Sequence, residues 1–142
     1  MIICGFPGVG KSVMAEHSNW VDLESTPFEK DWIRYAKVAK HMSDSGYVVM
    51  VSTHSEMLDA LEKLNEDYII VIPPLTDDYI YKKRYEERNN TPEFINKVME
   101  SWTHWLNDII DRPSPYKTVI ILESDSGIKE LSEKFIGAFH EH

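Results

Sequence analysis

Short runs of apolar residues alternate along the chain with longer segments in which apolar side chains recur every three or four positions. The short runs are typical of strands buried on both faces, and they occupy residues 1–4, 20–23, 47–51, 68–72 and 118–122. The longer segments predict helices at residues 13–17, 29–45, 55–66, 76–88, 92–110 and 127–137. Strands that alternate with helices predict an α/β fold, in which a mainly parallel sheet has helices on both faces.

The same pattern indicates where a ligand would bind. Open parallel sheets bind ligands beyond the carboxyl ends of their strands, so we expect chemistry in the segments that follow the predicted strands. These segments are residues 5–12, 22–26, 52–55, 73–77 and 123–127. No repeat, low-complexity stretch or linker interrupts the alternation, and 142 residues suit one hydrophobic core. We therefore predict a single domain over residues 1–142.

Composition and charge narrow the range of functions. The formal net charge is −9, which argues against a duplex nucleic acid as partner because its phosphates repel an acidic surface. The single cysteine, Cys4, allows neither an internal disulfide nor a cysteine-based zinc site. His140 and His142 are only weak indications of a metal site. We find neither a signal peptide nor an apolar run long enough to span a membrane, and we expect a cytoplasmic protein with no membrane partner.

Half of the glycines stand in one short stretch. The chain has 6 glycines, and three of them belong to the segment Gly-Phe-Pro-Gly-Val-Gly-Lys-Ser at residues 5–12. This segment matches G-x-x-x-x-G-K-[ST] between a predicted strand and a predicted helix, which is the context in which the motif binds nucleotide phosphates. Glycine torsions let consecutive N–H groups turn toward a phosphate. A chance glycine turn does not explain the combined spacing, position and Lys-Ser ending.

The motif assigns a role to each of its positions. We expect nucleotide binding by a run of six residues: Gly8, Val9, Gly10, Lys11, Ser12 and Val13. The Lys11 ammonium is expected to reach the β- and γ-phosphates and to take part in catalysis, and the Ser12 hydroxyl to ligate Mg²⁺. The predicted cofactors are therefore ATP and Mg²⁺.

Two carboxylates end the second predicted strand, in the segment Asp22-Leu23-Glu24. Side chains two positions apart in a strand point to the same face, so both acids can face the cleft beyond the strand. A phosphoryl acceptor needs a base or an orienting group for its hydroxyl, and Mg²⁺ needs an outer carboxylate, so we predict that Asp22 and Glu24 are both catalytic. The alternative interpretation is a pair of solvated acids at a strand end.

Two arginines, Arg84 and Arg88, stand four residues apart on one face of the predicted helix 76–88. Arginine suits bidentate contact with phosphate and stabilises charge on a transferring phosphoryl group, so both are predicted catalytic residues. The sequence does not show which of them contacts phosphate. The alternative is a salt-bridged surface helix, because Lys82, Lys83, Glu86 and Glu87 stand alongside.

Two further clusters follow predicted strands. Ser52, Thr53 and His54 offer hydroxyls and an imidazole, although Ser52 or Thr53 as a cap of the next helix explains the first two equally well. Residues 123–127 form either a loop that contacts the nucleotide base or a simple turn with a helix cap.

With these segments in place, the chain resembles the small P-loop kinases, the group that includes nucleoside monophosphate, shikimate and gluconate kinases. The order of elements is similar over nearly the whole chain, and residues 5–12 carry the specific part of the resemblance. The resemblance implies a P-loop NTPase three-layer sandwich whose five parallel strands follow the order 2-3-1-4-5. The compact, acidic form is also similar to nucleotide-kinase-like proteins encoded by bacteriophages.

The resemblance also implies roles for individual segments. Asp22-Leu23-Glu24 resembles the D-x-D of shikimate- and gluconate-type kinases, whose first acid is associated with magnesium and whose second is associated with the acceptor. The resemblance therefore implies that Asp22 holds Mg²⁺ directly or through water and that Glu24 orients the acceptor. A lid-like segment at about 82–95 would carry the arginines, and an acceptor-side segment at about 25–45 would include Arg34. Residues 123–127 would correspond to a loop that packs on adenine.

The chain departs from this family pattern at two places. Glu24, one methylene longer, replaces the second Asp of the D-x-D, which weakens the transfer of that acid's role. Ser52-Thr53-His54 stands where shikimate kinases carry three glycines, which argues against shikimate as the acceptor. We expect an ATP-dependent phosphotransferase whose partners are ATP and a small-molecule acceptor, with a nucleoside monophosphate as first candidate and a sugar acid or polyol as the alternative. A nucleotide-binding regulatory protein without efficient phosphotransfer is the competing class. The oligomeric state stays open.

Overall fold

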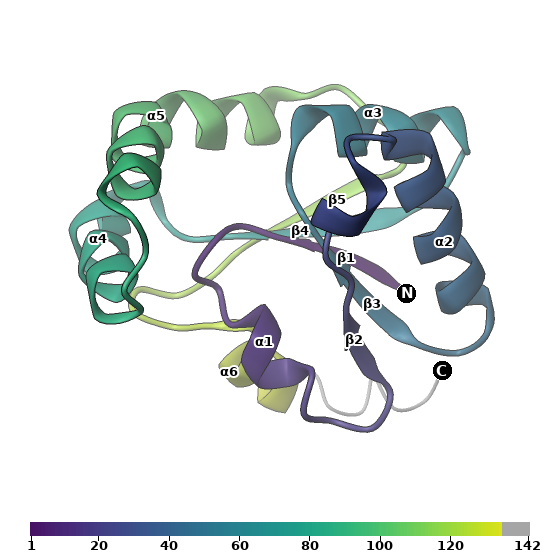
Figure 1. Cartoon of the computed structure of the whole chain (residues 1–142), viewed down its shortest axis with the longest axis horizontal. Coiled ribbons are helices and arrows are strands. Elements are labelled where there is room, and N and C mark those ends of the chain that lie inside the picture. The colour runs from purple at the N-terminus through teal and green to yellow at the C-terminus, as the bar shows by residue number, and fades with distance from the viewer. Residues whose placement is uncertain (135–142) are drawn as a thin grey trace.

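A computed structural model describes residues 1–134 and contains one five-stranded sheet (Figure 1). The strands are β1 (Ile2–Gly5), β2 (Trp20–Asp22), β3 (Val48–Val51), β4 (Tyr68–Ile72) and β5 (Lys117–Ile121). All neighbouring pairs are parallel, and the spatial order is β2-β3-β1-β4-β5. The predicted α/β class and the predicted strand order are both confirmed.

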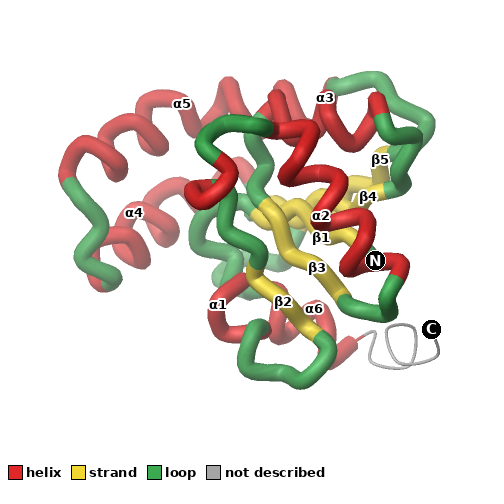
Figure 2. Tube along the Cα trace, turned by 45° about the vertical axis from the view of Figure 1, so that its right-hand side comes forward, coloured by secondary structure: helices red, strands yellow, loops and turns green. Residues whose placement is uncertain are grey.

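Helices lie on both sides of this sheet. They are α1 (Lys11–Met14), α2 (Trp32–Asp44), α3 (Ser55–Lys63), α4 (Asp78–Glu87), α5 (Pro92–Asp111) and α6 (Ile128–Lys134). Figure 1 shows α1 and α6 below the sheet and α3 and α5 above it, and Figure 2 shows the same separation from a second direction. Among residues 1–134, no helix is long and apolar enough to cross a membrane.

The position of each strand in the sheet explains its hydrophobic pattern. Residues of β1 and β3 are buried on both faces, because helices cover both sides of the central strands. The edge strand β5 differs, since it pairs on one side only, with β4, and the side chain of Ile121 is 55% exposed. A continuous apolar run therefore predicted the strand correctly, but not its half-exposed position.

Several predicted helices begin or end at other residues than expected; the helix predicted at 55–66, for example, ends at Lys63. The helix expected at 13–17 is α1, which ends at Met14 because the next residues form turns, with the His17 amide bonded to the Met14 carbonyl at 3.0 Å. The helix expected at 29–45 starts only at Trp32. Glu29 and Lys30 have positive φ angles of 50° and 68°, which a right-handed helix does not accommodate.

The predicted helix 76–88 is also divided. A short 3₁₀ turn, Leu75–Asp77, precedes α4, so Asp77 lies outside the regular helix. The last predicted helix begins at Ile128, and the part of it beyond Lys134 lies outside the described residues, as do His140 and His142.

Trp102 joins α5 to the loop that follows β4. Its indole N–H donates to the Leu75 carbonyl at 2.9 Å, and its ring meets Phe6 edge-on with the two centroids 5.4 Å apart. Because Phe6 belongs to the segment 5–12, this contact packs α5 against the segment that carries the glycine motif.

Trp102→Phe should lower the free energy of unfolding by about 2–3 kcal/mol, because it removes the hydrogen bond to Leu75 and leaves a cavity. Urea denaturation measures this loss. Trp105→Phe on the same helix is the matched control, since Trp105 is only half-buried, and we expect a loss below about 1 kcal/mol. Equal losses in the two variants would contradict the packing described here.

Candidate functional site

Three consecutive carbonyls of the loop between β1 and α1, called here the motif loop (residues 5–12), accept hydrogen bonds from distant parts of the chain. The pairs are the Tyr85 hydroxyl with Pro7 (2.6 Å), the Arg84 guanidinium with Gly8 (3.0 Å) and the Ile128 amide with Val9 (2.8 Å). Two donors come from α4 and one from the first residue of α6. Because a planar peptide points its N–H and C=O in opposite directions, these bonds turn the amides that follow away from α4 and α6.

The amides of the same loop are largely free. Within residues 1–134, five backbone N–H groups donate no hydrogen bond to the protein: those of Gly8, Gly10, Lys11, Ser12 and Val13. The Val9 amide bonds within the loop, to the Phe6 carbonyl at 3.2 Å. Successive free N–H groups on a turn form an anion-binding concavity, so the backbone can bind a phosphate chain.

Two glycines of the motif are required by close contacts. Gly8 has a φ of 92°, and a Cβ there would lie 3.0 Å from a ring carbon of Tyr81 and 3.1 Å from one of Tyr85. A Cβ at Gly5 would lie 2.9 Å from two carbons of the Lys11 side chain, which crosses that position. The glycines therefore let α4 approach the loop on one side and Lys11 fold across it on the other.

Lys11 is the half-buried cation of the site. Burial lowers the pKa of its ammonium, whereas the nearby carboxylates of Asp22 and Glu24 raise it and the guanidinium of Arg88 lowers it further. No hydrogen bond joins this ammonium to another residue in the described part of the chain. The structure thus places Asp22, Glu24 and Arg88 within electrostatic range of Lys11.

Asp22 ends β2, which pairs with β3, and a buried phenol joins the residues that follow these two strands. The Tyr35 hydroxyl donates to the Leu23 carbonyl at 2.5 Å and accepts the Ser52 amide at 3.3 Å. Burial raises the pKa of Asp22, with Lys11 opposing the shift and Glu24 adding to it, while Glu24 itself is exposed. The sequence missed Tyr35, because its helical spacing places the ring in the core and says nothing of the hydroxyl.

The two arginines, which the sequence could not separate, have different surroundings. The Arg84 guanidinium bonds the Gly8 carbonyl and the Asp125 carboxylate, both at 3.0 Å, and lies 4.4 Å from the centre of the Tyr81 ring. Arg88 caps the C-terminal end of α4, is exposed, and acts on Lys11 only through its charge. Arg84 therefore contacts the loop's backbone, whereas the Arg88 guanidinium makes no hydrogen bond or ion pair within residues 1–134.

One carboxylate organises the loop after β5, the β5–α6 loop (residues 122–127). Asp77 is 2% exposed and is the only buried charged residue among those described. It accepts the Ser124 hydroxyl and the Asp125 amide, both at 2.8 Å. The sequence places Asp77 within the predicted helix 76–88 and within the segment 73–77 that follows the fourth predicted strand, and the second of these positions was the available signal. Residues 123–127 form a turn, with the Ser126 amide on the Glu123 carbonyl at 3.1 Å.

The cluster after β3 differs from the predicted helix cap. His54 occupies the cap position of α3, so the interpretation of Ser52 or Thr53 as the cap is wrong. The His54 ring instead contacts the Ser52 hydroxyl at 2.9 Å and lies 5.0 Å from the Trp32 ring. Burial lowers the pKa of His54, so the imidazole is neutral at pH 7.

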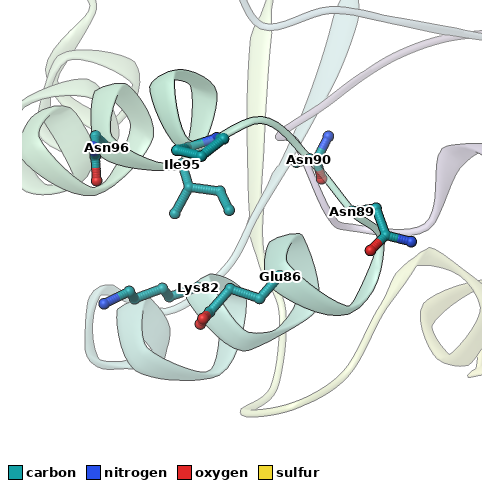
Figure 3. A pocket seen from close by; sticks show the side chains of 7 residues that line it. Lys82, Glu86, Asn89, Asn90, Ile95 and Asn96 are labelled. Carbon is teal, nitrogen blue, oxygen red and sulfur yellow. The ribbon is translucent and has the colours of Figure 1, made fainter.

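A surface hollow of about 460 Å³ lies where α4 turns into α5, and Figure 3 shows Ile95 pointing into it from α5. Its lining residues are Lys82, Glu86, Asn89, Asn90, Pro92, Ile95 and Asn96. No residue of the motif loop lines this hollow, which is therefore separate from the candidate site.

The donors near the motif loop suit Mg²⁺ held together with phosphate. Ser12 offers an exposed hydroxyl and Asp22 a half-buried carboxylate, and residues 1–134 contain no group of three or more His, Cys, Asp or Glu able to hold a metal alone. Magnesium is commonly bound by one or two protein oxygens plus substrate phosphates.

Comparison with models of known protein families finds no match, and comparison with curated proteins finds none either.

Asp22→Asn should stabilise the protein at pH 7 by less than about 1 kcal/mol, because solvent screens a half-buried charge. The folded state raises the pKa of Asp22 above 3.8, so it binds the proton more tightly than the unfolded chain does. Stability of the unsubstituted protein therefore falls, relative to Asp22→Asn, as the pH rises from 4 to 7. Thermal unfolding across this range measures the difference.

Glu24→Gln removes the same charge from an exposed position two residues away, and it is the matched control. We expect a smaller effect on stability at pH 7, because water screens an exposed charge more strongly than a half-buried one. If Asp22→Asn is less stable than the unsubstituted protein at pH 7, the burial argument for Asp22 is wrong.

Proposed function

We propose that this protein is an ATP-dependent phosphotransferase of the small P-loop kinase type. The observation that supports it best is the motif loop, in which three carbonyls are hydrogen-bonded to α4 and α6 while five amides make no hydrogen bond within residues 1–134. A triphosphate needs such donors already oriented, since ordering them during binding would cost affinity. Lys11 adds a positive charge beside these amides, and Arg88 adds a second charge from the end of α4.

Charge development during transfer explains the placement of these groups. The acceptor oxygen forms a bond to the γ-phosphorus while the bond from that phosphorus to the bridging oxygen breaks, and ADP leaves. Lys11 and Arg88 neutralise the negative charge of the phosphoryl group in transit. Bound Mg²⁺ would neutralise the phosphate oxygens further, held by the Ser12 hydroxyl and, directly or through water, by Asp22.

The two acids, Asp22 and Glu24, bear on which chemical class of acceptor the protein uses. A hydroxyl acceptor must lose its proton, and an exposed carboxylate such as Glu24 can receive it. A nucleoside monophosphate presents an ionised phosphate and needs no such base. The resemblance to nucleotide kinases makes a nucleoside monophosphate the first candidate, with Arg34 on the exposed side of α2 as its cation. The position of Glu24 near Lys11 favours the alternative, a sugar acid or polyol.

Lys11→Ala should weaken binding of Mg·ATP by about 100-fold or more, because it removes the positive charge beside the free amides. Isothermal titration calorimetry measures the affinity. Lys83→Ala removes a positive charge from the exposed surface of α4 and should leave the affinity nearly unchanged. Equal affinities for Lys11→Ala and the unsubstituted protein would contradict the proposed role of the loop.

Glu24→Gln distinguishes the two acceptor classes. With a hydroxyl acceptor we expect kcat to fall by about 100-fold, since the variant cannot take the proton. With a nucleoside monophosphate we expect no loss, because the acceptor phosphate is already ionised. Coupled-enzyme detection of ADP against nucleoside monophosphates, sugar acids and polyols measures both. Binding of ATP without turnover on any acceptor would instead support a nucleotide-binding regulatory protein.

A further inference from the structure

Arg84 connects three segments that are far apart in the sequence. Its guanidinium donates to the Gly8 carbonyl at 3.0 Å, to the Asp125 carboxylate at 3.0 Å and to the Ser126 carbonyl at 3.4 Å. Its side chain is 24% exposed and lies over the Tyr81 ring. Most of the directions in which a guanidinium can donate are thus taken by this protein's own oxygens.

The partner carboxylate of Arg84 is itself held in place. The buried Asp77 accepts the Asp125 amide at 2.8 Å, and this fixes the residue that holds Arg84. The β5–α6 loop, to which Asp125 belongs, also lies close to the motif loop. A Cβ at Gly127 would be only 3.0 Å from the Val9 carbonyl oxygen. A continuous set of contacts therefore runs from Asp77 through Asp125 and Arg84 to the Gly8 carbonyl.

We propose that Arg84 is a positioning residue for the motif loop, and that Asp125 acts with it by fixing the direction of its guanidinium. Together they hold the Gly8 carbonyl toward α4, which keeps the neighbouring amides directed at the phosphates. This inference rests on the proposed function for its consequence in catalysis, but the positioning itself is a property of the protein without nucleotide. Arg88, rather than Arg84, then contacts the phosphoryl group.

Removal of the Asp125 carboxylate distinguishes the positioning role of Arg84 from the alternative role, in which Arg84 contacts the phosphate directly. If Arg84 were a phosphate ligand, loss of a competing acid would free its guanidinium and remove a nearby negative charge, so an anion would bind equally well or more tightly. If Arg84 positions the loop, loss of the acid leaves the guanidinium undirected, and the anion binds more weakly.

Asp125→Gly is the most direct variant, because φ at this position is 54°, a conformation that glycine adopts without strain. The probe is inorganic tripolyphosphate with Mg²⁺, which has no base to contact the β5–α6 loop. We expect its dissociation constant to rise about tenfold in Asp125→Gly and in Arg84→Met. Arg84→Lys, which keeps a single charged donor, should fall between Arg84→Met and the unsubstituted protein. Lys83→Met removes a charge from the same helix and should bind as the unsubstituted protein does.

Hydrogen exchange of the Val9 amide tests the positioning without any ligand. This amide bonds to the Phe6 carbonyl only while the loop keeps its shape, so its exchange should accelerate about tenfold in Arg84→Met and Asp125→Gly. The Val49 amide in β3, bonded to the Met1 carbonyl, is the internal reference. A purely global loss of stability would accelerate both amides together and would contradict the proposal.

The outcomes distinguish this inference from the proposed function. If the unsubstituted protein binds neither tripolyphosphate nor ATP, the proposed function is wrong, and exchange at Val9 still decides whether Arg84 positions the loop. If tripolyphosphate binds and Asp125→Gly binds it equally well or more tightly, the positioning role is wrong although the phosphate site stands. Unchanged exchange at Val9 in Arg84→Met also overturns it.

Discussion

The hydrogen bonds to three consecutive carbonyls, those of Pro7, Gly8 and Val9, are the constraint on which the rest of the structure depends. They require α4 to lie against the loop, which in turn requires a glycine at position 8. They also require the β5–α6 loop to reach the same place, and the buried carboxylate of Asp77 fixes that loop. Of the amides left free, those of Gly8 and Gly10 are turned to the other side by these bonds, whereas those of Lys11, Ser12 and Val13 are free because they lie in the first turn of α1.

The β2–β3 side of the sheet follows a second, separate constraint. The β2–β3 ladder and the phenol of Tyr35, which bonds Leu23 and Ser52 just beyond the two strands, together place Asp22 and Glu24 beside the loop. The half-buried charges of this cluster destabilise the protein without a ligand. Burial lowers the pKa of Lys11 and raises the pKa of Asp22, so it disfavours the charged form of both groups. Opposed charges kept close without direct pairing are typical of sites that bind a ligand.

Local patterns in the sequence were sufficient for the strands, most helices and the loop motif, because these depend on neighbours a few positions apart. Strand order came from the resemblance to known kinases. The partners of Arg84, Asp77 and Tyr35 could not be predicted, because they join segments separated by 12 to 76 positions and hydrophobic periodicity does not specify which polar atoms meet. The early end of α1 could not be predicted for a related reason. The turns that follow Met14 connect α1 to the start of β2, where the Trp20 amide bonds to the His17 carbonyl.

The most direct test of the central claim is a titration of the ¹⁵N-labelled protein with Mg·ATP, followed by amide chemical shifts. The account predicts that the five free amides, those of Gly8, Gly10, Lys11, Ser12 and Val13, shift together with one saturable dissociation constant, because all of them donate to the same phosphates. Shifts confined to other regions, with these five amides unchanged at saturation, would contradict it.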